Sequence, residues 1–215
     1  AISMAKKAER LGVDIRMNTK VTPEMIEEIK PHTVMNAIGA ESIIPPIPGV
    51  DTAFVKDSHD VLDGKAEATG NVVVIGGGMV GMETAEYLAE KGAKVSVLEM
   101  LPDICSDMGT TRKICMGEEI QKSGIIPVTS VKVTEIGDNV VIGEKDGEKV
   151  EFPCDTAVLA IGAKKRDGSA LAETCYKNGI GYFEIGDAAM ARRAINATRE
   201  AMDAALTFDR EDVHR

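Results

Sequence analysis

Six consecutive residues, Gly76–Gly77–Gly78–Met79–Val80–Gly81, form the pattern with the clearest chemical meaning. The pattern follows the apolar run Val72–Ile75, which predicts a buried strand, and opens a helical pattern over Met79–Lys91. A strand, a glycine-rich turn and a helix start bind a diphosphate, because exposed backbone amides and the helix dipole hold its charge. We expect Gly76 to permit the tight turn, Gly78 to let the diphosphate approach, and Gly81 to let the helix pack closely on the sheet.

An acidic residue follows the glycine pattern at the spacing that dinucleotide sites require. Glu99 ends an apolar strand pattern, Val95–Glu99, about 20 positions after the loop. A carboxylate there accepts hydrogen bonds from the adenosine ribose and repels a 2′-phosphate. No Lys or Arg lies between Lys94 and Arg112. The sequence therefore predicts an NAD site rather than an NADP site.

The elements that must position these residues alternate from Val72 onward. We expect buried strands at 72–75, 95–99 and 155–161, helices at 79–91 and 110–122, and an antiparallel meander over 128–152 around Asp138–Asn139 and Asp146–Gly147. Strands that alternate with helices predict an α/β fold with a Rossmann-like, three-layer domain. Further along, the segment 179–187 is followed by an expected helix over about 194–208.

The first part of the chain has its own pattern. Apolar residues at helical spacing predict a helix over Ile2–Leu11, stopped by Gly12, and a strand over Val13–Met17. A helix that feeds a strand is the second half of a strand–helix–strand unit, so we expect a piece of a longer polypeptide. A short helix over Pro23–Lys30, a strand over Thr33–Ala37, and a Pro-rich connector that leads through a solvated stretch to Asn71 should follow.

Composition excludes several classes of function. The 215 residues carry 25 Lys+Arg against 35 Asp+Glu, for a net charge of −10, and no Trp, which argues against a nucleic-acid partner. The longest uncharged stretch is too short and Gly-rich to span a membrane, so a cytoplasmic protein is expected. The cysteines and histidines are scattered without metal-ligand spacing, so no metal site is predicted. The cysteines are Cys105, Cys115, Cys154 and Cys175.

Three further motifs resemble those of flavoproteins with two dinucleotide-binding domains. Asn36–Ala40, which contains Gly39, and Ala160–Ala163, which contains Gly162, resemble the two A-T-G motifs, although both read A-I-G here. Tyr182–Ala188 resembles the G-D motif, in which Gly186 precedes Asp187. The resemblance implies that 57–164 is an NAD-binding domain inserted into a partial FAD-binding domain of 1–56 and 165–215. It also implies that Asp187 bonds to the FAD ribityl chain.

Within this superfamily the chain most resembles the C-terminal part of 2,4-dienoyl-CoA reductase and 2-enoate reductase-type enzymes. The cues are Gly12–Ile15, Asn18–Thr22, Met82–Ala85 and Arg192–Ile195. The resemblance implies NADH oxidation through FAD, with FMN, a 4Fe-4S cluster, the substrate barrel and the first FAD glycine loop upstream of Ala1. It leaves the oligomeric state open, including a homo-oligomer, and gives this chain no catalytic residue.

Several alternatives stay open at this level. The parent enzyme can instead resemble a ferredoxin or rubredoxin reductase or a pyridine nucleotide-disulfide oxidoreductase, and the chain alone can be an NAD-binding module without turnover. Glu83 matches a position near the nicotinamide and flavin in relatives, yet an early-helix Glu also suits the helix dipole. Cys105 and Cys115 lack the motif of a redox pair, and we interpret them as structural.

Overall fold

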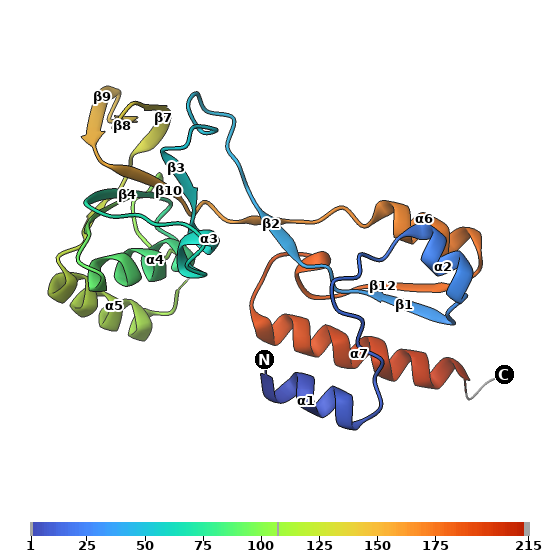
Figure 1. Ribbon diagram of the computed structural model, residues 1–215. Coiled ribbons are helices and arrows are strands. Elements are labelled where there is room, and N and C mark those ends of the chain that lie inside the picture. Colours follow the sequence, from blue (N-terminus) through green and yellow to red (C-terminus); the bar gives the residue numbers. More distant parts are fainter. Residues whose placement is uncertain (1, 107, 213–215) are drawn as a thin grey trace. The chain divides into compact units, whose positions relative to one another are not determined.

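The computed structural model describes residues 2–106 and 108–212 and divides them into two compact units (Figure 1). Unit 1 comprises the residues up to Gly39 together with those from Lys165 onward, and unit 2 runs from Ala40 to Lys164. The chain therefore enters and leaves unit 2 from unit 1. This division places 40–56 in unit 2, whereas the sequence-based expectation places them with the first domain.

Unit 2 is built on a five-stranded, all-parallel sheet. Its strands, in spatial order, are β3 (Val55–Asp57), β10 (Thr156–Leu159), β4 (Asn71–Ile75), β5 (Lys94–Leu98) and β6 (Ile126–Val128). The central strand β4 is a run of β-branched residues with Val72–Ile75 buried, as expected for a strand covered on both faces. The predicted strands at 72–75, 95–99 and 155–161 are confirmed.

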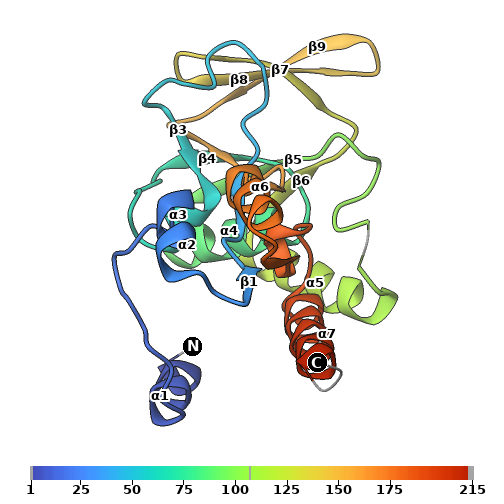
Figure 2. The same ribbon diagram turned by 90° about the vertical axis from the view of Figure 1, so that its right-hand side faces the viewer.

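Two different layers cover this sheet. On one face lie α3 (Ser58–Leu62), α4 (Met79–Glu90) and α5 (Thr110–Ser123). On the other lies an antiparallel meander of β7 (Lys132–Gly137), β8 (Val140–Lys145) and β9 (Glu148–Pro153). Val72 and Val74 pack toward the helices, and Val73 and Ile75 pack toward the meander. Figure 2 shows the three layers, which confirms the predicted α/β fold class.

The predicted turns of the meander are also confirmed. Asn139 and Asp146 adopt left-handed backbone conformations with φ of 57° and 53°, as Asn and Asp do readily in tight hairpins. The meander packs on the sheet through buried Val131, Ile136 and Val141. It thereby brings the start of β7 next to the carboxyl end of β5.

Unit 1 has a two-stranded parallel sheet among its described residues. β1 (Thr33–Asn36) pairs with β12 (Gly181–Glu184), and α2 (Pro23–Ile29) and α6 (Ser169–Lys177) lie over one face (Figure 1). The remaining elements are α1 (Ile2–Arg10), the 3-10 helix η1 (Gly186–Ala188) and α7 (Ala194–Asp212). Thr22 caps α2 and accepts a hydrogen bond from Met25 N through its side-chain hydroxyl.

Two expectations about the first part of the chain are wrong. Val13–Met17 is not a strand: the segment has no ladder partner among the described residues and is exposed along its length. The stretch before Asn71 is not merely solvated, because it contains the edge strand β3 and the short helix α3, whose Val61 is 2% exposed. The Pro-rich segment also belongs to unit 2, where Ile136 N donates a hydrogen bond to Pro48 O.

Two short strands accompany the passage of the chain between the units. β2 (Ala40–Ser42) pairs with β11 (Ala163–Lys165), Ile43 N donates to Gly162 O at 3.0 Å, and Lys164 forms an ion pair with Glu41. No helix within residues 2–106 and 108–212 combines the length and apolar character needed to cross a membrane.

Candidate functional site

The glycine loop lies at the point where the strand order of the unit 2 sheet reverses. From β4 the chain adds β5 and β6 on one side, whereas β10 pairs with β4 on the other. Open parallel sheets bind ligands in the crevice at the carboxyl ends of the strands at such a switch point. A cavity of about 560 Å³ lies there, lined by Gly76, Gly78, Met79, Val80, Glu99 and Gly162, among others.

Two glycines of the loop are required by packing within the chain. Gly76 has a φ of 109°, and a Cβ on it would lie 2.4 Å from Ala160 O at the end of β10. A Cβ on Gly81 would lie only 1.9 Å from Gly76 O. Any side chain at either position would therefore force β4, β10 and α4 apart. Because both positions are glycine, the helix can start close to the sheet.

Gly78 differs from these two glycines. Its φ of −73° and ψ of −176° are open to any residue, and no described heavy atom would lie within 4 Å of a Cβ there. Gly78 is the N-cap of α4 and provides no side-chain capping bond, so the first backbone N–H groups of the helix face open space. That space fits an anionic ligand at a helix N-terminus, and a side chain at Gly78 would fill it.

Glu99 connects the glycine loop to the segment after β5. Its Oε2 accepts a hydrogen bond from Gly77 N and its Oε1 accepts one from Leu101 N, both at 2.7 Å. A Cβ on Gly77 would lie 2.9 Å from the Cβ of Glu99, so the loop is also packed against this side chain. Each carboxylate oxygen keeps a further lone pair for a ligand. The spacing in the sequence predicts a ribose-binding carboxylate but not this structural role.

Cys105 supports the loop from the other side. It is 2% exposed, its N donates to Gly77 O at 2.8 Å, and its Sγ lies 3.5 Å from the Met116 sulfur. The side chain of Cys115 lies outside the described residues. Burial raises the pKa of the Cys154 thiol to about 11, so this cysteine stays protonated at neutral pH. No group of three metal-ligating side chains occurs in the described part of the chain.

Helix α4 also carries an acidic side chain that the sequence pattern did not single out. The Oε1 of Glu86 is buried and finds no hydrogen-bond partner among the described residues. Burial, together with the nearby carboxylates of Glu119 and Glu83, raises the pKa of Glu86. Glu83 is exposed on the same helix.

The remaining predicted residues lie in unit 1, at the carboxyl ends of β1 and β12. Gly39 has a φ of 78° and open space around it, and Gly186 has a φ of 61° and donates its N–H to Glu200 Oε2 at 2.8 Å. The Oδ1 of Asp187 accepts a hydrogen bond from Arg192 N at 3.0 Å. Ile185 N donates to Asn36 O, so the two strand ends lie side by side.

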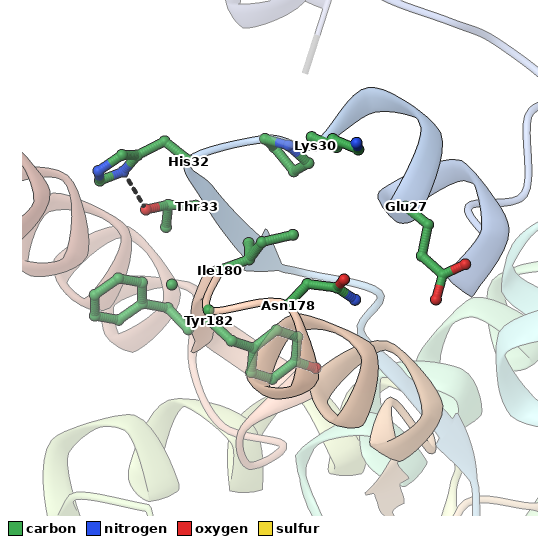
Figure 3. Close-up of a pocket in the computed structure, with 11 residues that line it drawn as sticks. Glu27, Lys30, His32, Thr33, Asn178, Ile180 and Tyr182 are labelled. Carbon is green, nitrogen blue, oxygen red and sulfur yellow. Dashed lines mark hydrogen bonds between the residues drawn. The ribbon is translucent and has the colours of Figure 1, made fainter.

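A cavity of about 690 Å³ in unit 1 contains none of the predicted site residues (Figure 3). It lies at the amino ends of β1 and β12, where His32 Nδ1 is 3.0 Å from Thr33 Oγ1. In Figure 3 the Glu27 carboxylate and the His32 ring lie on opposite sides of it. The predicted residues thus form two groups, one around the unit 2 cavity and one at the β1–β12 strand ends.

Comparison with known proteins shows which family the chain is similar to. The family model of the pyridine nucleotide-disulphide oxidoreductases matches residues 2–187. Bilirubin reductase of Mediterraneibacter gnavus is 41% identical over 161 residues, covering 75% of this chain and 25% of that protein. NADH oxidase of Thermoanaerobacter brockii is 39% identical over 201 residues, covering 91% of this chain and 31% of that protein.

A solved structure gives the same result at the level of the fold. A complex of 2-naphthoyl-CoA reductase matches with a TM-score of 0.82 and 30% identity, covering 90% of this chain and 29% of that one. The chain thus spans less than a third of each of these three proteins. The matches confirm the predicted resemblance to the FAD- and NAD(P)-binding part of enoate-reductase-type enzymes, and the homologues are FAD-dependent NAD(P)H oxidoreductases. The chain belongs to the pyridine nucleotide-disulphide oxidoreductase family.

Proposed function

We propose that unit 2 binds NADH, with the diphosphate at Gly76–Gly81 and the adenosine ribose at Glu99. The observation that carries this proposal is Gly78. The chain itself has no steric need for glycine there, yet the position opens onto the first amides of α4. In this arrangement Met79 and Val80 offer backbone N–H groups to the diphosphate, and Gly162 borders the cavity across from them at the end of β10.

The proposed nicotinamide cofactor is NADH rather than NADPH. Glu99 is held in place by two backbone N–H groups, so it cannot easily turn away from a 2′-phosphate. Like charges placed together weaken binding by several kcal/mol at most, and by less where water reaches them. We therefore expect NADPH to bind more weakly than NADH.

In a longer protein, unit 1 would contribute to an FAD site. Gly39, Gly186 and Asp187 lie together at the ends of β1 and β12 and suit the ribityl side of that cofactor. They do not suit its diphosphate, because no second glycine-rich turn between a strand and a helix occurs in the described part of unit 1. When bound, FAD supplies hydride acceptance and the release of single electrons. The protein residues orient the two cofactors.

The parent enzyme is proposed to be of the 2-enoate or 2,4-dienoyl-CoA reductase type, with FMN, a 4Fe-4S cluster and the substrate barrel elsewhere in the polypeptide. The similarity to bilirubin reductase and 2-naphthoyl-CoA reductase supports this type. The alternative is a parent related to ferredoxin, rubredoxin or disulfide reductases. In either case the isolated chain would bind nucleotide without turnover.

Calorimetric titration of the 215-residue chain with NADH and NADPH at fixed salt tests the proposal. We expect heat of binding with NADH, weaker binding of NADPH, and a colourless protein that takes up no FAD at micromolar concentration. Absence of NADH binding would refute the cofactor site. Stoichiometric FAD in the chain would instead identify Gly76–Gly81 as the flavin loop.

The FAD part of the proposal needs the longer polypeptide. That protein should be yellow, and its flavin should bleach on addition of NADH without oxygen. Asp187→Ala in it should weaken flavin retention more than NADH binding, because Asp187 lies in unit 1 and the glycine loop in unit 2. Equal loss of both cofactors would contradict the division of the two sites between the units.

A further inference from the structure

The cavity beside the glycine loop contains a charged residue that belongs to neither recognised motif. Among the described residues that line it, Glu99 is the one anion and Lys132 is the one cation. Lys132 is the first residue of β7, far from Glu99 in the sequence. The positive charge of Lys132 can therefore change the preference for NADH over NADPH that Glu99 alone would give.

The backbone places Lys132 beside Glu99. Val131 N donates a hydrogen bond to Glu99 O at 2.9 Å, and Ser130 N donates to Leu101 O at 3.1 Å. Lys132 follows directly after these contacts, is exposed, and is one of the residues that line the cavity. The diphosphate position at Gly78 lies at the end of β4, whereas Lys132 adjoins the end of β5, on the ribose side.

Lys132 makes no ion pair in the part of the chain that the structure describes. The carboxylate of Glu99 is bound by Gly77 N and Leu101 N instead. Glu144 lies opposite Lys132 in the β7–β8 register, yet no ion pair joins them. The ammonium is therefore available to an anion that enters the cavity, as far as residues 2–106 and 108–212 are concerned.

We propose that Lys132 is a specificity-determining residue that pairs with the 2′-phosphate of NADPH. This inference rests on the proposed function of unit 2. Lys132 partly offsets the repulsion from Glu99, so NADPH remains a weak but real ligand. NADH, which has no phosphate at that position, gains little from the same side chain. If Lys132 instead contacted the diphosphate, which both cofactors have, it would strengthen the binding of NADH and NADPH equally.

The test compares NADH and NADPH dissociation constants of the 215-residue chain, Lys132→Ala and Lys132→Arg by calorimetry at fixed salt. Lys132→Ala should weaken NADPH binding about fivefold and leave NADH binding within about twofold, as for a partly exposed ion pair. Lys132→Arg should retain NADPH binding. The loss should shrink as salt is raised, because exposed charges are screened.

Lys94→Ala is the matched control, because it removes one exposed positive charge at the opposite end of β5. It should change neither constant. Equal weakening of both cofactors by Lys132→Ala, no effect on NADPH, or no measurable NADPH binding by the unaltered chain would overturn the role of Lys132. Failure to bind NADH would instead refute the proposed function of unit 2, so the two failures are distinguishable.

Discussion

Replacement of Gly78 by valine and of Gly81 by alanine should separate cofactor binding from folding. A Cβ on Gly78 would meet no described atom within 4 Å, whereas a Cβ on Gly81 would lie 1.9 Å from Gly76 O. The larger substitution therefore enters open space, and the smaller one enters the closest backbone contact in the loop. We expect the larger one to weaken NADH binding strongly and the smaller one to destabilise the fold.

The magnitudes follow from these surroundings. Gly78→Val loses the N-cap preference for glycine, about 1 kcal/mol, or about 4 °C in melting temperature for a chain of this size. Gly81→Ala must separate its Cβ from Gly76 O by about 1 Å more, and overpacking of that kind costs up to about 3 kcal/mol when the obstructing atom is backbone. Loss of the charged hydrogen bonds to a diphosphate should weaken NADH binding about 100-fold, or about 2.7 kcal/mol.

Thermal unfolding and NADH titration of both variants provide the assay. Gly78→Ala, which has a smaller side chain at the same position, should fall between the parent and Gly78→Val in affinity. The reasoning is refuted if folded Gly78→Val binds NADH like the parent, or if Gly81→Ala melts at the parent temperature. The first result would mean that Gly78 is not needed for cofactor binding, and the second that Gly81 is not needed for packing.

Glu86→Gln should stabilise the chain at neutral pH, because burial raises the pKa of Glu86 and the folded state therefore favours its protonated form. Protonated Glu86 contributes its full stabilisation below the unfolded-state pKa near 4.5, and this contribution is lost as the pH rises through the folded-state pKa. The difference in free energy of unfolding between the variant and the parent should therefore shrink on acidification. Denaturant unfolding over a pH series measures this difference, with Glu67→Gln as the control, because Glu67 is exposed and lies outside α4. A difference that grows in acid would contradict the assignment. Cys105→Ala should lower the free energy of unfolding by about 1 kcal/mol and leave NADH affinity unchanged, since the bond to Gly77 O comes from its backbone N–H. A disulfide of Cys105 that forms and breaks during NADH oxidation, detected by thiol trapping and mass spectrometry, would show instead that it is redox-active.

Local patterns were sufficient for the elements whose partners are also local. The strand at 72–75, the glycine turn and the helix after it were predictable, because a buried parallel strand and a helix start each leave a mark in adjacent residues. Val13–Met17 has the composition of a strand but forms none, since a strand requires a neighbour and none of the described residues provides one. The strand propensity of a segment does not show whether another strand lies beside it in the fold.

The candidate site was predictable in the same partial way. The spacing from Gly76 to Glu99 indicates a carboxylate at the cofactor, but not that this carboxylate also holds Gly77 N and Leu101 N. Lys132 gave no signal, because it reaches the cavity only when the meander packs on the sheet. Residues brought to a site by a separate layer have no fixed spacing from its motif.

The pairing of β2 with β11 has a consequence for the order of folding. In unit 1, pairing of β1 with β12 requires the two ends of unit 2 to come together. If unit 2 is still unfolded, the pairing closes a loop that contains all of 40–164, and the entropy of closing so long a loop opposes it. Once unit 2 has folded, Glu41 and Lys164 already lie side by side, so only 37–40 and 165–180 remain to be closed between β1 and β12. Unit 2 should therefore fold first, and the β1–β12 pair of unit 1 should form after it.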